Sequence, residues 1–148
     1  MKIDRNIILT RFKKMDELIQ NLKELKKKSK EEFLSNYLVY LSTQRALETC
    51  INICIDIGNH ILSLNKNGMP ETYGDIFIEL SKLGLINKEI EEKLIKMVKF
   101  RNLLGHIYLE ISNEKIYEIL QENLDDFNLF KKQIYSNFKE QLLNEKKK

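Results

Sequence analysis

Residues that interrupt helices are scarce in this chain: glycine occurs five times and proline once in 148 residues. Chains rich in β-hairpins or disorder depend on such residues, so their scarcity excludes both classes. Hydrophobic residues make up 43% and charged residues 32% of the sequence, the balance of a compact helical protein. We therefore predict one all-α domain over residues 1–148, long enough to bury a core without metals or disulfides.

Cysteine is also rare, with only Cys50 and Cys54. Because they lie four residues apart in a helical pattern, the two side chains share a helix face and fit a role in packing. A disulfide framework or a zinc site needs more ligands or another spacing, and adding His60 still leaves the set incomplete. The sequence predicts neither a metal nor another cofactor.

Long apolar runs are absent as well. The first apolar run, residues 7–9, is interrupted at once by Thr10 and Arg11, which is unlike a signal peptide. No run approaches the roughly 20 residues that cross a bilayer. We expect a cytoplasmic protein with no membrane partner.

Apolar residues recur at intervals of three and four along most of the chain, the pattern of amphipathic helices. This spacing predicts an antiparallel bundle of about five helices, over residues 5–27, 30–65, 73–83, 88–104 and 113–143. Ser29 and Glu32 have the spacing of a capping box at the start of the second helix, and Asn87 fits the N-cap of the fourth. The second helix is apolar on more than one side, so it is central to the bundle or also covered by a partner subunit.

Charge is unevenly distributed although the net charge is only +3. Residues 1–35 carry ten Lys or Arg against six acidic residues, and the chain ends in three lysines. Such an excess permits binding to a polyanion, but lysine-rich solvated helix faces look the same and are commoner. Charge alone does not decide between the two.

The stretch RNLLGHIY, residues 101–108, gathers the residue types that cleave phosphodiesters. Histidine moves protons near neutral pH, and the arginine fork fits phosphate oxygens; in RNA the 2′-hydroxyl supplies an internal nucleophile, so no metal is required. On an unbroken helix Arg101 and His106 would point about 140° apart, but a helix end at Gly105 lets them converge. A structural account, with His106 on the helix dipole and Arg101 in a surface ion pair, is favoured by the spacing alone.

Residues 100–108, FRNLLGHIY, resemble the R-N-x-x-x-H-x-Y signature of the HepT-like toxins, a branch of the HEPN superfamily of all-helical ribonucleases. Three further blocks follow the same family in the right order: residues 45–60 resemble its central helix, 69–77 the segment after it, and 116–127 its closing helix. The resemblance covers about residues 29–140.

This resemblance implies roles for four residues. Arg101 and His106 match the catalytic pair, Asn102 matches the polar residue after the arginine, and Tyr108 matches a tyrosine that receives AMP. The family implies a homodimer in which two signatures face each other and cut RNA without metal. It also implies a partner, a minimal nucleotidyltransferase antitoxin, which neutralises the toxin by AMPylation of Tyr108.

A second polar cluster, Asp56, Asn59 and His60, has the i, i+3, i+4 spacing of one helix face. It forms satisfied hydrogen bonds in a core, or it supports the active site. In the second case we expect Asp56 to orient or pair with Arg101 of the same subunit or of its mate.

The sequence therefore predicts a metal-independent endoribonuclease toxin of a type VII-like toxin–antitoxin system, which cleaves RNA by attack of the 2′-hydroxyl. The alternative is a non-catalytic HEPN-type binding or adaptor protein that partners a nucleotidyltransferase. A structural protein whose basic helices bind RNA or protein is a further alternative. The intact Arg101, Asn102 and His106 favour the enzyme.

Overall fold

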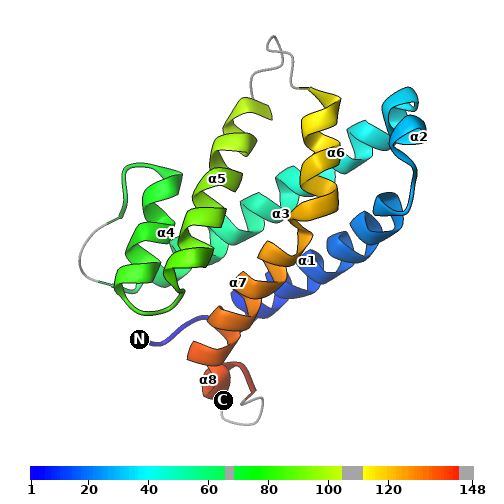
Figure 1. The fold of residues 1–148 in the computed structure, drawn as a ribbon. Coiled ribbons are helices and arrows are strands. Elements are labelled where there is room, and N and C mark those ends of the chain that lie inside the picture. The colour runs from blue at the N-terminus through cyan, green and yellow to red at the C-terminus, as the bar shows by residue number, and fades with distance from the viewer. Residues whose placement is uncertain (66–68, 105–111, 144–148) are drawn as a thin grey trace.

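The computed structural model describes residues 1–65, 69–104 and 112–143 (Figure 1). These ranges contain helices and no strand, which confirms the all-α class. The helices are α1 (Arg5–Lys26), α2 (Lys30–Ser35), α3 (Tyr37–Ser63), α4 (Tyr73–Lys82), α5 (Lys88–Leu104), α6 (Asn113–Glu122), α7 (Leu124–Asn137) and α8 (Lys139–Leu143).

Helix α3 is the centre of the bundle. It packs against α1, α2, α4, α5, α6 and α7, and it runs opposite in direction to α1 (Figure 1). Most of its circumference is apolar and buried, as the sequence predicted for the central helix; the fully or almost fully buried residues include Leu47, Cys50, Ile51, Cys54, Ile57 and Ile61. One polar strip, from Arg45 through Asn52 to Asn59, is left along one side of α3. Arg11 of α1 and Arg101 of α5 contact α3 along this side.

The predicted helix over 30–65 is interrupted at Asn36. Its backbone is extended, at φ −113° and ψ 100°, and its Oδ1 accepts a hydrogen bond of 3.1 Å from the N–H of Leu38. Asparagine competes with the helix for its own backbone bonds, so it caps a new helix without any glycine or proline. The apolar spacing continues across the break, and for that reason the sequence predicted one helix where there are two.

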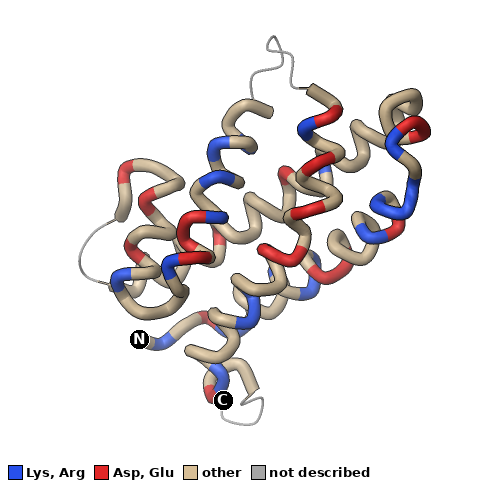
Figure 2. Tube along the Cα trace, in the orientation of Figure 1, with Lys and Arg blue, Asp and Glu red and all other residues tan. Residues whose placement is uncertain are grey.

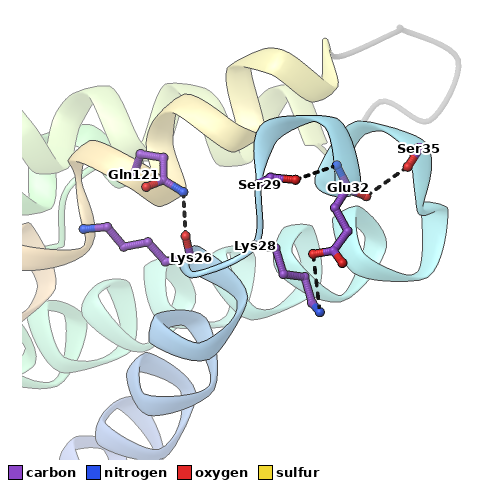
Figure 3. A network of polar contacts seen from close by, with 6 residues as sticks. All are labelled: Lys26, Lys28, Ser29, Glu32, Ser35 and Gln121. Atoms are coloured by element: carbon purple, nitrogen blue, oxygen red, sulfur yellow. Dashed lines mark hydrogen bonds and ion pairs between the residues drawn. The ribbon is translucent and has the colours of Figure 1, made fainter.

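The start of α2 confirms Ser29 as a cap and corrects the capping box. Ser29 Oγ accepts from the N–H of Glu32 at 3.1 Å, whereas the Glu32 carboxylate turns to Lys28 Nζ at 3.9 Å (Figure 3). Nearby, Gln121 Nε2 donates to the Lys26 carbonyl at 3.0 Å and ties α6 to the end of α1 (Figure 3). The connection between α1 and α2 is thus fixed by the Ser29 cap of α2 and by the bond from Gln121 of α6.

The predicted last helix is divided twice, at Asn123 and at Phe138. Asn123 leaves helical geometry, at φ −119° and ψ 5°, and its Nδ2 donates to Asp126 Oδ2 at 3.1 Å. Phe138 has a similar backbone, at φ −122° and ψ 23°, and its ring is buried. These divisions, with the one at Asn36, produce more helices than the five expected.

Helices α3 and α4 approach each other closely at Gly58. A Cβ added there would overlap Ile76 Cγ2 and lie 3.3 Å from Leu80 Cδ1. Gly84, at φ 75°, ends the turn after α4 in a conformation that favours glycine. These contacts fix the position of α4, whose first residue is Tyr73.

None of the helices in the described ranges combines the length and hydropathy that a membrane span requires.

Candidate active site around Arg101

Arg101 lies in the last turn of α5 and is held by side chains from three helices. Its Nε donates to Asn52 Oδ1 on α3 at 2.9 Å, and a terminal nitrogen lies 3.4 Å from Asn102 Oδ1. The guanidinium carbon lies 5.2 Å from the centroid of the Tyr73 ring on α4. The arginine is therefore fixed in place although its side chain is only half-buried.

The local sequence explains this placement. Phe100 and Leu104 are buried and orient the end of α5 against the core, so Arg101, next to Phe100, lies at the boundary with solvent. On α3, Asn52 is half-buried between the buried Ile51 and Ile53 and faces that boundary. Arg101 and Asn52 therefore lie where the buried residues of α5 and the polar strip of α3 adjoin at the protein surface.

His106 and Tyr108 lie outside the described residues, as does Gly105. The convergence of Arg101 and His106 at the helix end, and the role of Tyr108, stay predictions. Asn102 is described: it is exposed, and it lies beside Arg101 as a weak acceptor.

Asp56 does not contact Arg101 within the chain, which corrects the expected same-subunit pair. Its Oδ2 lies 3.5 Å from Nε of Arg11 on α1. The neighbour of Arg101 is instead Asn52, one turn earlier on α3. A four-residue step turns a helix by only about 40° beyond a full circle, so sequence spacing could not tell these two residues apart. Contact of Asp56 with Arg101 of a mate stays a prediction.

A second member of the predicted polar cluster, His60, has a structural contact. His60 Nε2 accepts a hydrogen bond of 2.8 Å from the backbone N–H of Asp4, the N-cap of α1. Its imidazole therefore anchors the N-terminal segment to the end of α3. Asp56 is about half exposed, at 51%, so the cluster is not a buried core network.

Asn52 and Tyr73 were missed as site residues. The available signal for Asn52 was a polar residue inside the apolar stretch CINIC, residues 50–54 of the central helix. Its partner is 49 residues away, and only the fold reveals it. Tyr73 lies in the block 69–77 that resembles the family, but nothing in the sequence indicated that it would contact Arg101.

The two thiols are unsuited to chemistry. Burial raises the pKa of Cys50 to about 12, and burial together with the neighbouring Cys50 raises that of Cys54 well above its ordinary value. Both stay protonated at neutral pH, and thiols in this form are poor nucleophiles and poor metal ligands. Over the described part of the chain, no three His, Cys, Asp or Glu side chains gather as a metal site would need.

Charged side chains elsewhere are largely balanced (Figure 2). Three lysines near the N-terminus, Lys14, Lys27 and Lys28, pair with neighbouring acids; Lys27, for example, lies 3.1 Å from Glu24. A groove of about 400 Å³ between α5 and α6 has three lysines, but Lys93 lies 3.4 Å from Asp126, and Lys115 lies 3.5 Å from Glu118. The bond to Glu89 and the charge of Asp126 raise the pKa of Lys93. Lys93 and Lys115 thus have acidic partners, whereas the acceptor of Arg101 Nε is a neutral amide.

Comparison with known proteins points to one family. The family model described as "Ribonuclease HepT-like" matches residues 15–134. A curated relative, "tRNA nuclease HepT" of Aphanizomenon flos-aquae, is 31% identical over 134 residues, which cover 90% of this chain and 91% of that protein. Another, "mRNA nuclease HepT" of Shewanella oneidensis, is 35% identical over 101 residues, covering 68% of this chain and 73% of that protein.

Solved structures agree with these relatives. The tri-AMPylated HEPN toxin of Shewanella oneidensis, in complex with MNT antitoxin, matches with a TM-score of 0.82 at 27% identity, over 88% of this chain and 98% of that chain. The Bacillus subtilis protein YutE, described as a cytosolic protein of unknown function, matches with a TM-score of 0.81 at 20% identity, over 96% of each chain. At that identity the likeness to YutE shows the fold alone.

Proposed function

This chain belongs to the HepT-like family of ribonucleases, and we propose that it is a metal-independent endoribonuclease, the toxin of a type VII-like toxin–antitoxin system. The observation that carries the proposal is the complete R-N-x-x-x-H-x-Y pattern at residues 101–108, whose arginine is held half exposed at the end of α5. The relatives named as tRNA and mRNA nucleases support RNA as the substrate.

In the proposed reaction the 2′-oxygen of one ribose attacks the adjacent phosphorus after losing its proton. The bond from phosphorus to the 5′-oxygen of the next nucleotide breaks, and that oxygen takes up a proton. His106 carries the proton transfer, and Arg101 stabilises the negative charge that gathers on the phosphoryl oxygens. The products are a 2′,3′-cyclic phosphate and a 5′-hydroxyl, and the scheme uses no metal.

A homodimer is part of the proposal, with the two signatures facing each other. Exposed apolar side chains support it: Leu38 is 63% and Leu41 44% exposed on α3, and Leu103 is 49% exposed beside the signature on α5. Leu38 and Leu41 lie three residues apart on one face of α3, and adjoining exposed apolar side chains are typical of an interaction surface. Light scattering should give twice the chain mass of 17.6 kDa, and a monomeric mass would contradict this part.

Control by a minimal nucleotidyltransferase is supported by the AMPylated HEPN toxin found with MNT antitoxin. AMP on Tyr108 would place a phosphate two residues from His106 and close in sequence to Arg101, where it competes with RNA phosphate for the same cation. We expect Tyr108→Phe to cleave RNA and to escape modification at residue 108. Mass spectrometry that finds AMP at that residue in the variant would contradict this step.

The test of the function is incubation of unmodified protein with tRNA and with mRNA in EDTA. Wild-type protein should cut at least one of them and leave 2′,3′-cyclic phosphate ends, whereas His106→Ala, with unchanged circular dichroism and unchanged mass in solution, should not cut. Equal cleavage by His106→Ala would overturn the assignment of His106. No cleavage by the wild type would favour an adaptor protein over an enzyme.

A further inference from the structure

The contacts of Arg101 suggest how its charge is kept available. Building on the proposed function, we propose that Asn52 and Tyr73 are positioning residues that hold Arg101 without neutralising it and direct one edge of its guanidinium toward RNA phosphate. The hydrogen bond from Nε to Asn52 Oδ1 and the ring of Tyr73 against the guanidinium are the two contacts that carry the proposal.

The acceptor of Nε is neutral, and this distinguishes Arg101 from other arginines along α3. Arg11 lies 3.5 Å from the Asp56 carboxylate, and Arg45 lies 3.8 Å from that of Glu48. A carboxylate partner would cancel the positive charge and compete with phosphate for the same donors. An amide oxygen orients the guanidinium equally well and leaves its full charge for a ligand.

The contacts also leave one direction of approach. Guanidinium has five N–H donors, of which one on Nε is used by Asn52 and one on a terminal nitrogen points toward Asn102. The Tyr73 ring lies beside the guanidinium, with its centroid 5.2 Å from Cζ. Within residues 1–65, 69–104 and 112–143, the donors that remain belong to the two terminal nitrogens, and such a pair of nitrogens forms the end-on fork that binds two phosphate oxygens.

Tyr73 is suited to this role because its position is fixed from outside the site. It is the first residue of α4, whose N-cap Thr72 accepts a hydrogen bond of 3.2 Å from the N–H of Asp75. Its ring is 44% exposed, so its removal creates no large cavity in the core. An aromatic face beside an arginine attracts it through the ring quadrupole without changing its net charge.

The first test is Asn52→Asp, which keeps the shape and the acceptor and adds only a negative charge. With wild-type protein cleaving RNA, the variant should lose about tenfold or more of kcat/KM near pH 7.5, mainly through a raised KM, because an ion pair now holds Arg101. Because Arg101 lowers the pKa of the introduced carboxyl group below its ordinary value of about 3.9, the loss should be the same at every pH from about 5 to 8. A merely structural defect would lower kcat and thermal stability as well, rather than mainly raise KM.

Asn59→Asp is the matched control. Asn59 is also half-buried, and it lies seven residues after Asn52 on the same side of α3, so the change adds the same charge to the same helix two turns from Arg101. This variant should stay within about twofold of the wild type, since charges about 10 Å apart at moderate salt are largely screened. An equal loss in both variants would show a general charge effect and overturn the role of Asn52.

The Tyr73 variants test the second contact, and they keep the proposal falsifiable if Asn52→Asp does not fold. Tyr73→Phe keeps the ring and should retain kcat/KM within about twofold, whereas Tyr73→Leu should raise KM about fivefold at unchanged thermal stability. If the wild type cleaves and Tyr73→Leu and Asn52→Asp, where folded, cleave equally well, the positioning roles are wrong and the proposed function stands. If the wild type does not cleave, both fail.

Discussion

Two arginines approach the central helix α3 one turn apart, and they are in opposite electrostatic situations. Arg11 comes from α1 and lies against the carboxylate of Asp56, with its Nε shielded from solvent. Arg101 comes from α5 and donates to the amide of Asn52. Both guanidinium groups stay charged. The Asp56 carboxylate partly offsets the positive charge of Arg11, whereas the neutral amide of Asn52 does not offset that of Arg101.

The difference in partners predicts different roles for the two arginines. Arg11 also donates to the Ile7 carbonyl at 3.4 Å, so all of its described contacts join α1 to itself or to α3. Arg101 lies at the end of α5 as the first residue of the signature, and within the described residues the acceptors of its guanidinium N–H groups are the neutral amides of Asn52 and Asn102. We therefore expect the first arginine to affect stability and the second to affect RNA chemistry.

The largest expected effect separates the two arginines by activity. Arg101→Gln should reduce RNA cleavage by about 10²–10³-fold, because it removes the donors that stabilise charge on phosphorus. Arg11→Gln should stay within about threefold of the wild type, since its contact partner is a carboxylate of the scaffold. Single-turnover cleavage in EDTA measures both, with circular dichroism as the control for folding. If both variants fold and lose RNA cleavage equally, the two arginines do not differ in function as proposed.

A second prediction concerns α4, the helix that begins at Tyr73 and packs against α3. Gly58→Ala adds a methyl group where Ile76 and Leu80 leave no room, so it should lower the free energy of unfolding by about 1–3 kcal/mol. Gly74→Ala is the control: its nearest neighbour is Thr72 Oγ1 at 4.0 Å, and it should raise stability by about 0.5–1 kcal/mol. Urea denaturation measures both. A Gly58 variant as stable as the wild type would show that α3 and α4 can separate without cost.

The smallest effect is expected from Asp56→Asn, which gives Arg11 a neutral partner like that of Arg101. Both side chains of the pair are partly exposed, so the loss of stability should be at most about 1 kcal/mol and should shrink as salt is raised. RNA cleavage should be unchanged. A large loss of cleavage in the folded variant would instead show that Asp56 supports Arg101 of a second subunit.

The outcome of the sequence predictions has a physical pattern. Helices at 5–27, 73–83 and 88–104 were predicted closely because each needs a buried stripe, and the stripe is visible in the spacing of apolar residues. The breaks at Asn36 and Asn123 were missed because the apolar stripe continues across both. Asn36 caps a new helix by accepting from the N–H of Leu38, whereas the Asn123 side chain bonds the side chain of Asp126 and not the backbone of α7.

The same limit applies to the site. The family signature indicated Arg101 and Asn102 directly, since those residues form one short stretch. Their support could not be predicted in the same way: Asn52 and Asp56 lie four residues apart on one side of α3, and only the packing of α1 and α5 decides which arginine contacts which residue. The choice between a neutral and a charged partner is therefore a property of the fold.

The most direct test of the account is the salt dependence of RNA binding, measured in a His106→Ala background so that RNA stays intact. If the charge of Arg101 is available to phosphate, Arg101→Gln should reduce the slope of log K against log salt concentration by about 0.7, the value for one single-strand phosphate contact. Arg11→Gln should leave the slope unchanged. An unchanged slope for Arg101→Gln, or an equal change for both variants, would contradict the claim that the neutral partner on α3 keeps Arg101 free for RNA.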